Sequence, residues 1–384
     1  MNLPPLSLYV HLPWCVKKCP YCDFNSHTAG DAAPKARYIK ALLADLGRES
    51  EFAQGRAIES VFLGGGTPSL FSPAEIGRLL DGVREQFSMK DNAEITMEAN
   101  PGTVECGSPA GYREAGITRL SIGAQSFDDA LLSGLGRIHS SADIVRAADE
   151  ARISGFDNIN IDLMHGLPGQ SIAMALADLR AAIKLKPAHL SWYQLTLEPN
   201  TVFYARPPAN LPDDDLAFEI QDRGQALLAE HGYEQYEVSA YAKDGRRCGH
   251  NLNYWLFGDY LAAGAGAHGK ITTPDGVFRY QKPANPLQYM LSLEATASSC
   301  DLRSLSRADL VFDFMLNALR LNEGFAESLF VDRTGLSAAE LQDVTSKAQA
   351  KGLLERTTDG FWKATNLGGR FLNDLQSEFL VDEA

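Results

Sequence analysis

The stretch Leu6-Ser-Leu-Tyr-Val-His-Leu-Pro-Trp-Cys15-Val-Lys-Lys-Cys19-Pro-Tyr-Cys22-Asp-Phe24 carries the strongest signal in the chain. An apolar, strand-like run leads into three cysteines at Cys-x-x-x-Cys-x-x-Cys spacing on one short loop. Three thiolates can hold three irons of a four-iron cubane, which leaves one iron without a protein ligand. A structural zinc ion requires a closed set of four ligands, and no fourth ligand follows nearby. Cys15, Cys19 and Cys22 are therefore predicted to be cluster ligands, with one iron open for chemistry.

Disulfide pairing is the competing interpretation of these cysteines, but three is an odd number for a disulfide framework. The sequence begins Met-Asn-Leu-Pro-Pro with no basic residue before Lys17, and no long apolar run follows. Neither a signal peptide nor a transmembrane segment is therefore expected. A cytoplasmic location fits these features, and clustered cysteines in a reducing compartment usually indicate metal or redox chemistry.

The bulk composition narrows the class of protein. A length of 384 residues predicts two or more domains. Apolar residues make up 45% of the chain and charged residues 22%, which is ordinary for a folded globular protein. The net charge of -14 argues against broad nucleic-acid binding, because affinity for phosphates requires clustered Lys and Arg.

The first half of the chain alternates strand-like apolar runs with segments of helical periodicity. This alternation predicts an α/β fold with a parallel sheet and outer helices, and six such units could form an incomplete barrel. Ligands of such sheets bind at the carboxyl ends of the strands. The predicted strands are 6–12, 60–63, 94–98, 119–125, 158–164 and 189–196, and the predicted helices are 35–51, 73–87, 128–133, 142–154 and 172–184.

The pattern changes after residue 200. Residues 201–212 are Pro-rich and are predicted to be a linker, followed by a helix at 216–231 and a strand at 236–241. From about residue 300, helices are predicted at 310–321, 338–350 and 367–380, with a hairpin of short strands, 353–357 and 361–365, around Asp359-Gly360. Helices with a hairpin indicate a winged-helix-like module, and its lack of a basic face disfavours DNA binding. The predicted domains are 1–212, 213–299 and 300–384.

A second motif, Gly64-Gly65-Gly66-Thr67-Pro68, follows a predicted strand and would let the backbone approach a ligand closely. A tight strand-to-helix turn explains the same residues equally well. The motif lacks the further residues of a P-loop or a dinucleotide fingerprint. Because the motif occurs together with the three-cysteine loop, we favour the interpretation that it approaches a ligand.

Together with further motifs, the cysteine triplet and the glycine motif resemble those of a known protein family. The cysteine triplet, Gly-Gly-Gly-Thr-Pro-Ser and Glu98-Ala-Asn-Pro together resemble the radical S-adenosylmethionine superfamily. The segments 119–127, 135–139 and 160–168 resemble the branch with oxygen-independent coproporphyrinogen III dehydrogenase (HemN) and the HemW heme chaperones. The resemblance covers nearly the whole chain. It implies a partial (β/α)6 barrel with a mostly helical C-terminal domain, and a [4Fe-4S] cluster whose open iron is chelated by S-adenosylmethionine.

The resemblance also implies a set of S-adenosylmethionine contacts at the strand ends. Glu98 and Asp162 would accept hydrogen bonds from amino or ribose hydroxyl groups, and Arg137 would pair with a carboxylate. A surface ion pair is the alternative for Arg137, and a turn cap is the alternative for Asp162. The implied contacts are Tyr9, Gly65, Gly66, Thr67, Glu98, Gln125, Arg137 and Asp162.

Two features separate the two members of this branch. The dehydrogenase has a fourth cysteine in a Cys-x-Cys ending, whereas Cys22 here is followed by Asp23 and Phe24. The run 250–255, His-Asn-Leu-Asn-Tyr-Trp, resembles the His-Asn-x-x-Tyr-Trp motif linked with heme binding in HemW proteins. His250, Tyr254 and Trp255 are therefore the implied heme contacts.

Other assignments for the heme ligand stay open at this point. His11 lies beside the cluster loop, and Cys248 precedes the motif as a soft donor. A hydrogen-bonded packing role is the alternative for His250. One departure from the family lies at residues 105–111, where two glycines and a proline disfavour helix, so the following helix is expected to begin near Pro109.

The implied function is that of a heme chaperone, which binds heme and passes it to an acceptor protein that the sequence does not identify. No catalytic residue is assigned. Oxidative decarboxylation of coproporphyrinogen III is the enzymatic alternative, and a cluster-sensing nucleic-acid regulator is disfavoured by the acidic charge. No nucleic-acid partner is expected, and peripheral membrane contact is left open.

Overall fold

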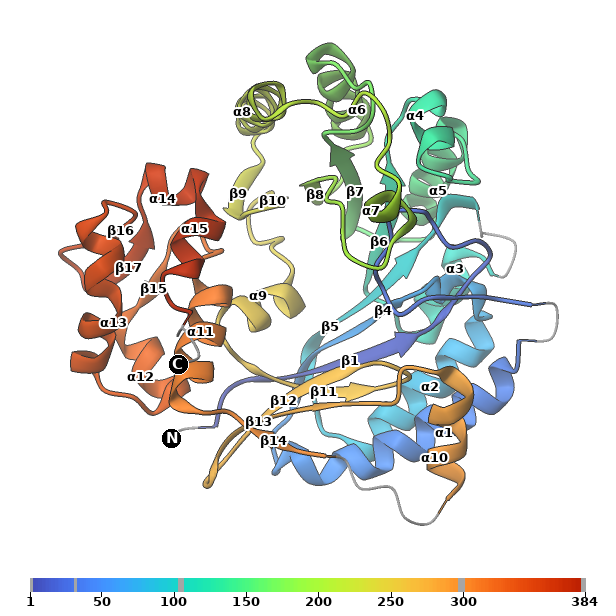
Figure 1. The fold of residues 1–384 in the computed structure, drawn as a ribbon. Helices are drawn as coiled ribbons and strands as arrows, with labels where there is room; N and C mark the ends of the chain where they lie inside the picture. Colours follow the sequence, from blue (N-terminus) through green and yellow to red (C-terminus); the bar gives the residue numbers. More distant parts are fainter. Residues whose placement is uncertain (1–2, 31–32, 103–106, 296–300, 381–384) are drawn as a thin grey trace.

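A large open sheet organises the chain (Figure 1). The computed structural model describes residues 3–30, 33–102, 107–295 and 301–380. Within these residues one sheet contains twelve strands, and its first and last strands do not pair with each other. In spatial order they are β14 (Arg303–Ser304), β13 (Gly276–Gln281), β12 (His268–Thr273), β11 (Asp259–Ala263), β1 (Leu6–Leu12), β4 (Ile58–Gly65), β5 (Met89–Ala99), β6 (Arg119–Gln125), β7 (Ile159–His165), β8 (His189–Gln194), β10 (Ala240–Ala242) and β9 (Glu234–Glu237).

The central strands, from β11 to β8, run parallel to one another. Six of them occur in the predicted chain order, which confirms the α/β fold and the open, incomplete barrel. β11 was not predicted. It pairs in parallel with β1, with Leu6 opposite Asp259, so the segment after residue 213 extends the sheet at both edges. All five β11 side chains are buried, so no alternation of apolar and polar residues marks the strand.

Helices connect the parallel strands and cover one face of the sheet (Figure 1). The residues at which these helices begin carry sequence signals for a helix start. Ser72 and Glu75 form a capping box at α2, and Ser108 with Pro109 starts α3 at the expected residue. The helices of this part are α1 (Lys35–Glu49), α2 (Pro73–Gln86), α3 (Pro109–Ala115), α4 (Asp129–Gly134), α5 (Ser141–Ile153) and α6 (Ile172–Lys184), with 3-10 turns η1 (Ser50–Ala53) and η2 (Pro68–Leu70).

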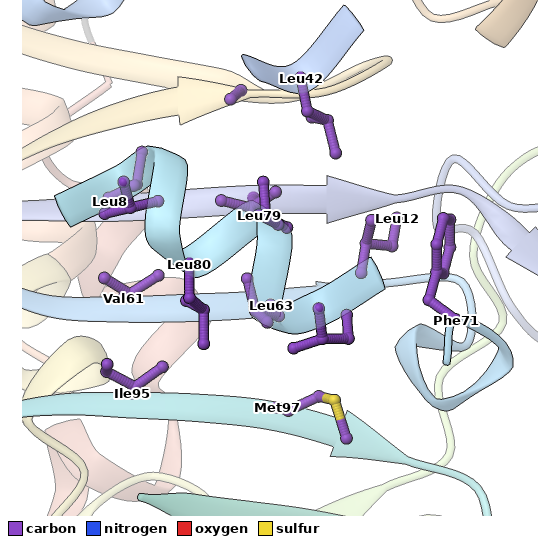
Figure 2. Close-up of a cluster of buried hydrophobic side chains, with 14 of the residues drawn as sticks. Leu8, Leu12, Leu42, Val61, Leu63, Phe71, Leu79, Leu80, Ile95 and Met97 are labelled. Carbon is purple, nitrogen blue, oxygen red and sulfur yellow. The ribbon is translucent and has the colours of Figure 1, made fainter. Parts of the chain in front are cut away.

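The main core lies between the sheet and these helices. Figure 2 shows side chains of β1, β4 and β5 packed against α2, with Leu42 of α1 above β1 in the view. Burial of each large aliphatic side chain stabilises the fold by about 1.5–3 kcal/mol. This packing fixes the strands relative to one another, and it therefore fixes the residues at their carboxyl ends. The labelled residues are Leu8, Leu12, Leu42, Val61, Leu63, Phe71, Leu79, Leu80, Ile95 and Met97.

Two predictions for residues 201–241 need correction. The segment predicted to be a linker contains a one-turn helix, α7 (Val202–Ala205), capped by Thr201. The single strand predicted at 236–241 is two antiparallel strands, β9 and β10, because the chain turns at Val238 and Ser239. The remaining helices before residue 300 are α8 (Asp214–Glu230), α9 (Gly249–Trp255) and α10 (Pro286–Glu294).

The C-terminal part has its own core around Phe314, Phe330 and Trp362. The hairpin predicted around Asp359-Gly360 is confirmed as β16 (Leu354–Arg356) and β17 (Phe361–Ala364), which β15 (Phe325–Ala326) joins. The helix predicted at 367–380 is broken at Phe371, whose backbone leaves the helical region. The helices are α11 (Arg307–Ala318), α12 (Glu327–Thr334), α13 (Ala338–Ala350), α14 (Asn366–Arg370) and α15 (Leu372–Ser377). Across the described residues, no helix has the length and hydropathy to cross a bilayer.

Candidate metal centre and ligand cavity

The three cysteines lie on a loop that two short strands close. β2 (Trp14–Cys15) pairs in parallel with β3 (His27–Thr28), and the His27 amide donates to the carbonyl oxygen of Pro13 at 2.7 Å. Between these strands the amide of Cys22 donates to the carbonyl oxygen of Cys19 at 3.2 Å. All three thiols are free and only partly buried. The loop therefore presents three reactive sulfurs at the carboxyl end of β1.

The three thiols are electrostatic neighbours. Burial raises the pKa of the Cys15 thiol, and the charge of Cys19 raises it further. Burial also raises the pKa of the Cys22 thiol, with further contributions from Cys19 and Cys15. Iron offsets this cost because its positive charge stabilises thiolates. Among the described residues no three His, Cys, Asp or Glu side chains converge on one ion, whereas a cubane takes each thiolate on a different iron. The donor set fits a cubane.

Arg137 places a positive charge beside the thiols. Its Nη1 lies 3.6 Å from Cys19 Sγ, and its Nη2 donates to the carbonyl oxygen of Gly123 at 2.9 Å. Its Nε is buried and has no hydrogen-bond partner within the described part of the chain. A buried donor without a partner is uncommon in proteins, and a bound acceptor such as a ligand carboxylate would satisfy it. Arg137 is therefore not the surface ion pair that the sequence left as an alternative.

The glycine motif turns tightly against the cluster loop. The amide of Gly66 donates to the carbonyl oxygen of Leu12, and the amide of Thr67 donates to that of Trp14, both at 2.8 Å. A Cβ atom on Gly66 would lie 2.7 Å from the Trp14 carbonyl oxygen, which is closer than real Cβ atoms approach. Gly66 is therefore required by the backbone packing of the loop. This geometry supports the tight-turn interpretation and also brings the motif beside the thiols.

Gly66→Ala is expected to destabilise the protein by about 3 kcal/mol, because the added methyl group meets backbone atoms that cannot rotate away. Chemical denaturation followed by circular dichroism measures the effect. Gly77→Ala is the matched control: its Cβ would lie 3.7 Å from the nearest atom, inside α2, and alanine there is expected to stabilise by up to about 1 kcal/mol. Equal effects of the two substitutions would contradict this account of the turn.

Two predicted carboxylates, Glu98 of β5 and Asp162 of β7, lie on the two strands that flank β6. Burial raises the pKa of Glu98 to about 7, and the negative charge of Asp162 contributes, while the Gly65 amide, 3.0 Å from Glu98 Oε2, opposes the shift. Asp162 accepts hydrogen bonds from Ser121 Oγ at 2.8 Å and from Asn160 Nδ2 at 2.7 Å. These bonds tie Asp162 to its neighbouring strand rather than to a turn. A buried carboxyl group whose pKa is raised by burial and by a nearby carboxylate forms a site suited to a cationic ligand.

Gln125 shows that β6 is distorted at the same edge. Its φ is 71°, in the left-handed region that non-glycine residues seldom adopt, and the pairing of β6 with β7 shifts between Gly123 and Gln125. The Gln125 side chain accepts a hydrogen bond from the Tyr193 hydroxyl at 2.8 Å. Strained backbone of this kind persists where the surroundings hold it and is enriched at functional sites.

A cavity of about 740 Å³ opens beside these residues. Its volume lies in the range of cavities that bind small ligands. Tyr9, Gly65 and Glu98 line its inner end, while Thr67 and Arg137 lie with Cys19 around a much smaller adjacent recess. The remaining wall comes from elements far apart in the chain: Lys18, Asp23, Phe24, Asn25, Ser26 and His27 of the cluster loop, His11, Tyr254, Tyr260, and Gly266, Ala267, His268, Gln281 and Ala284.

The three residues implied as heme contacts have different surroundings in the structure. Tyr254 of α9 lines the cavity. His250 lies behind it and is 1% exposed, with Nδ1 bonded to Ser60 Oγ at 2.9 Å and Nε2 to the Tyr254 hydroxyl at 3.2 Å. Burial lowers the pKa of His250 to about 3, so its ring is neutral. Trp255 points elsewhere, with the Arg320 guanidinium 4.3 Å from its ring centroid.

Several cavity residues were missed by sequence reasoning. Asn25, His27 and Tyr260 belong to no motif, and only the folded chain brings them together. His268 lies in the run Gly264-Ala-Gly-Ala-His-Gly269, which resembles the HemW family, but the sequence assigns no role to its histidine. Asn160, which donates a hydrogen bond to Asp162, could have been recognised from the sequence. Asn160 and Asp162 are two polar residues that alternate with isoleucines in a buried strand.

Comparisons with known proteins agree with this geometry. Residues 9–182 match the family model of the radical SAM superfamily, and residues 305–371 match that of the HemN C-terminal domain. The cofactors of the superfamily are a [4Fe-4S] cluster and S-adenosylmethionine. The fold superposes on coproporphyrinogen III oxidase (HemN) of Escherichia coli with a TM-score of 0.81, at 23% identity, over 98% of this chain and 90% of that one.

Curated sequences match over the full length. The chain is 49% identical over 383 residues to the protein named heme chaperone HemW of Escherichia coli, with 100% of both chains covered. It is also 49% identical over 387 residues to heme chaperone HemW of Haemophilus influenzae, again with 100% of both covered. With this identity over its whole length, the chain belongs to the HemW family within the radical SAM superfamily.

Proposed function

We propose that this protein is a heme chaperone, which binds heme and transfers it to an acceptor apoprotein. The observation that carries the proposal is the 49% identity, over the full length of both chains, to a protein named heme chaperone HemW. The missing fourth cysteine supports it, because Phe24 stands where the dehydrogenase pattern has a thiol. The large cavity with aromatic walls supports it as well, since the faces of a porphyrin are apolar.

In this proposal the strand ends hold the cofactors. Cys15, Cys19 and Cys22 ligate the [4Fe-4S] cluster, and S-adenosylmethionine binds beside it. Glu98 and Asp162 face its cationic groups, and Arg137 offers the unpaired Nε–H to its carboxylate. Tyr9, Gly65, Gly66, Thr67 and Gln125 complete the proposed contacts. When bound, the cluster would supply an iron that the cofactor can chelate and that can exchange electrons with it.

The heme motif acts in this proposal mainly through Tyr254. The tyrosine presents its ring to the cavity, and the buried ring of His250 holds its hydroxyl in place. His250 also packs against Phe62, with ring centroids 5.1 Å apart, and Phe62 stacks on Tyr9. The contribution of Trp255 to heme binding stays a prediction.

Titration of the anaerobically reconstituted protein with heme tests the proposal. Saturable binding is expected for the wild type, and Tyr254→Ala is expected to weaken it about tenfold, because it removes an aromatic wall of the cavity. Tyr204→Ala is the matched control, since Tyr204 lies on α7 outside the cavity and is 56% exposed. Absence of saturable heme binding by the wild type would refute the chaperone function.

Oxidative decarboxylation of coproporphyrinogen III is the second candidate, because the fold matches that of HemN. Incubation with coproporphyrinogen III under reducing, oxygen-free conditions separates the two functions. Product analysis is expected to find no protoporphyrinogen IX, and its formation would favour the enzyme.

The partner and the location belong to the same proposal. We place the protein in the cytoplasm, where a reducing environment would keep its cysteine thiols free. The acceptor is a heme-binding apoprotein, and no nucleic acid is involved, in keeping with the net charge of -14. Co-purification of heme-loaded protein with candidate apoproteins, followed by the movement of heme absorbance between them, tests the transfer step.

A further inference from the structure

We propose that His268 is the residue that ligates the heme iron. This inference rests on the proposed heme-binding function and adds the ligand that the sequence motif does not supply. It follows from four observations: the place of His268 in the cavity wall, the occupied ring nitrogens of the other histidines, the neutral state of its ring, and the apolar and cationic groups around it.

His268 stands in the cavity wall on a rigid element. It is the first residue of β12 and pairs with Gln281 of β13, which lines the same cavity. The two strands form an antiparallel ladder from His268 to Thr273, so the backbone of His268 is held firmly. Its side chain is exposed, and its ring has no hydrogen bond to any residue that the structure describes.

Of the other histidines near the cavity, His11 and His250 have both ring nitrogens in use, and His27 has one. His11 bonds to the Tyr9 hydroxyl at 3.0 Å through Nδ1 and to the Asn25 carbonyl oxygen at 2.9 Å through Nε2. His27 is bonded through Nε2 to the Asn25 side chain at 3.2 Å. His250 is buried with both nitrogens bonded and does not reach the cavity. Iron ligation by His11 or His250 would require these bonds to break, whereas His268 has a ring nitrogen free.

The electrostatic surroundings of His268 keep its ring neutral, which is the form that binds iron. Partial burial lowers its pKa, and the positive charge of Arg279 lowers it further, so the ring is neutral at pH 7. A neutral imidazole carries the lone pair that binds iron. His11, His27 and His268 all line the same cavity, so three imidazole rings surround it.

The remaining wall suits a porphyrin. Tyr254 and Tyr260 pack edge to face with ring centroids 4.5 Å apart and offer an apolar surface. Phe24, which is 56% exposed, adds a further aromatic ring from the cluster loop. Lys18 bonds to the carbonyl oxygens of Phe24 and Ser26, and its ammonium can also pair with a propionate. The cavity therefore combines a free imidazole, aromatic faces and a cation.

Paired titrations of the full chain with hemin and with iron-free protoporphyrin IX test the proposal. His268→Ala is expected to weaken hemin binding at least about tenfold and to shift its Soret band, because the axial bond is lost. Binding of iron-free protoporphyrin IX is expected to stay within about twofold of the wild type, since the cavity walls remain. Added imidazole is expected to restore the wild-type Soret band of His268→Ala.

His231→Ala is the matched control, because His231 is an exposed histidine at the end of α8, outside the cavity. An unchanged Soret band and hemin affinity in His268→Ala would overturn the proposal while leaving the chaperone function standing. Equal losses of affinity for hemin and for protoporphyrin IX would also overturn it, because they would mean that the cavity had collapsed. Failure of the wild type to bind hemin would overturn the proposed function and, with it, this assignment.

Discussion

Cys19→Ser is expected to abolish the iron–sulfur cluster, with iron falling from about four atoms per chain to below about one after anaerobic reconstitution. Cys19 is the central thiol of the loop and the one that Arg137 contacts, at 3.6 Å from its Sγ. A serine hydroxyl is a far weaker ligand for iron than a thiolate. Two thiols cannot hold three irons of a cubane, so the whole cluster is lost rather than one corner of it. Iron analysis and the visible absorbance of the cluster measure this result.

Cys248→Ser is the matched control for this prediction. Cys248 is a fully buried thiol that donates to Glu94 Oε1 at 3.5 Å, and it does not line the cavity. Its substitution by serine is expected to leave the iron content unchanged. Retention of the full cluster by Cys19→Ser, or its loss in Cys248→Ser, would contradict the assignment of the three-cysteine loop.

Glu98→Gln is expected to stabilise the ligand-free protein above pH 7 by up to about 3 kcal/mol. Burial and the charge of Asp162 raise the pKa of Glu98 to about 7 in the folded chain. The folded protein therefore binds a proton that the unfolded chain releases at a lower pH. The stability that this proton contributes is fully present below about pH 4.5 and is lost as pH rises to about 7. A glutamine at position 98 stays neutral and keeps an acceptor for the Gly65 amide. The variant therefore does not lose this stability as pH rises.

Denaturant unfolding of the two proteins between pH 4 and pH 8 measures the effect. The difference in unfolding free energy is expected to grow between about pH 4.5 and 7 and then to level off. Because burial also raises the pKa of Asp178, to about 6, the wild type keeps part of its pH dependence in either case. Glu85→Gln, an exposed position on α2, provides the control. A difference that does not change with pH would exclude a buried, proton-binding Glu98.

The same carboxyl group links stability to cofactor binding. A cationic ligand beside Glu98 would favour the ionised form of this carboxyl group, so the cost of its buried negative charge is offset when the ligand binds. Affinity for S-adenosylmethionine is therefore expected to increase as pH rises through 7. The lower stability of the ligand-free protein is then expected, because the acidic groups of the site are arranged to bind a positively charged ligand.

The strands and the cluster loop were predictable because their signals are local. Three cysteines on one loop, capped helices and apolar runs each lie within about twenty residues of sequence. β11 was not predictable, because its partner β1 lies about 250 residues away and its side chains are uniformly buried. The turn between β9 and β10 contains Val238 and Ser239 and none of the glycine or asparagine residues that usually mark a hairpin.

The residues of the candidate site also fall into two groups: those that local motifs indicate and those that only the folded chain reveals. The cysteines lie on the cluster loop, Glu98 and Asp162 lie late in β5 and β7, and Arg137 follows α4; the motifs indicate all of these residues. The orientation of His250 depends on Ser60 and Phe62 of β4, so no local pattern reveals that its ring is buried. The role proposed for His268 depends on hydrogen bonds that occupy His11 and His250, and such bonds exist only in the folded chain.

The pairing of β1 with β11 has a consequence for synthesis on the ribosome. The partner of β1 on one side, Asp259–Ala263, is made only about 250 residues after β1. At about 5–20 residues per second, that edge of β1 stays unpaired for roughly 10–50 s. The cysteine loop follows directly from this unfinished strand. Newly made chains therefore need protection from edge-to-edge aggregation until the sheet is complete.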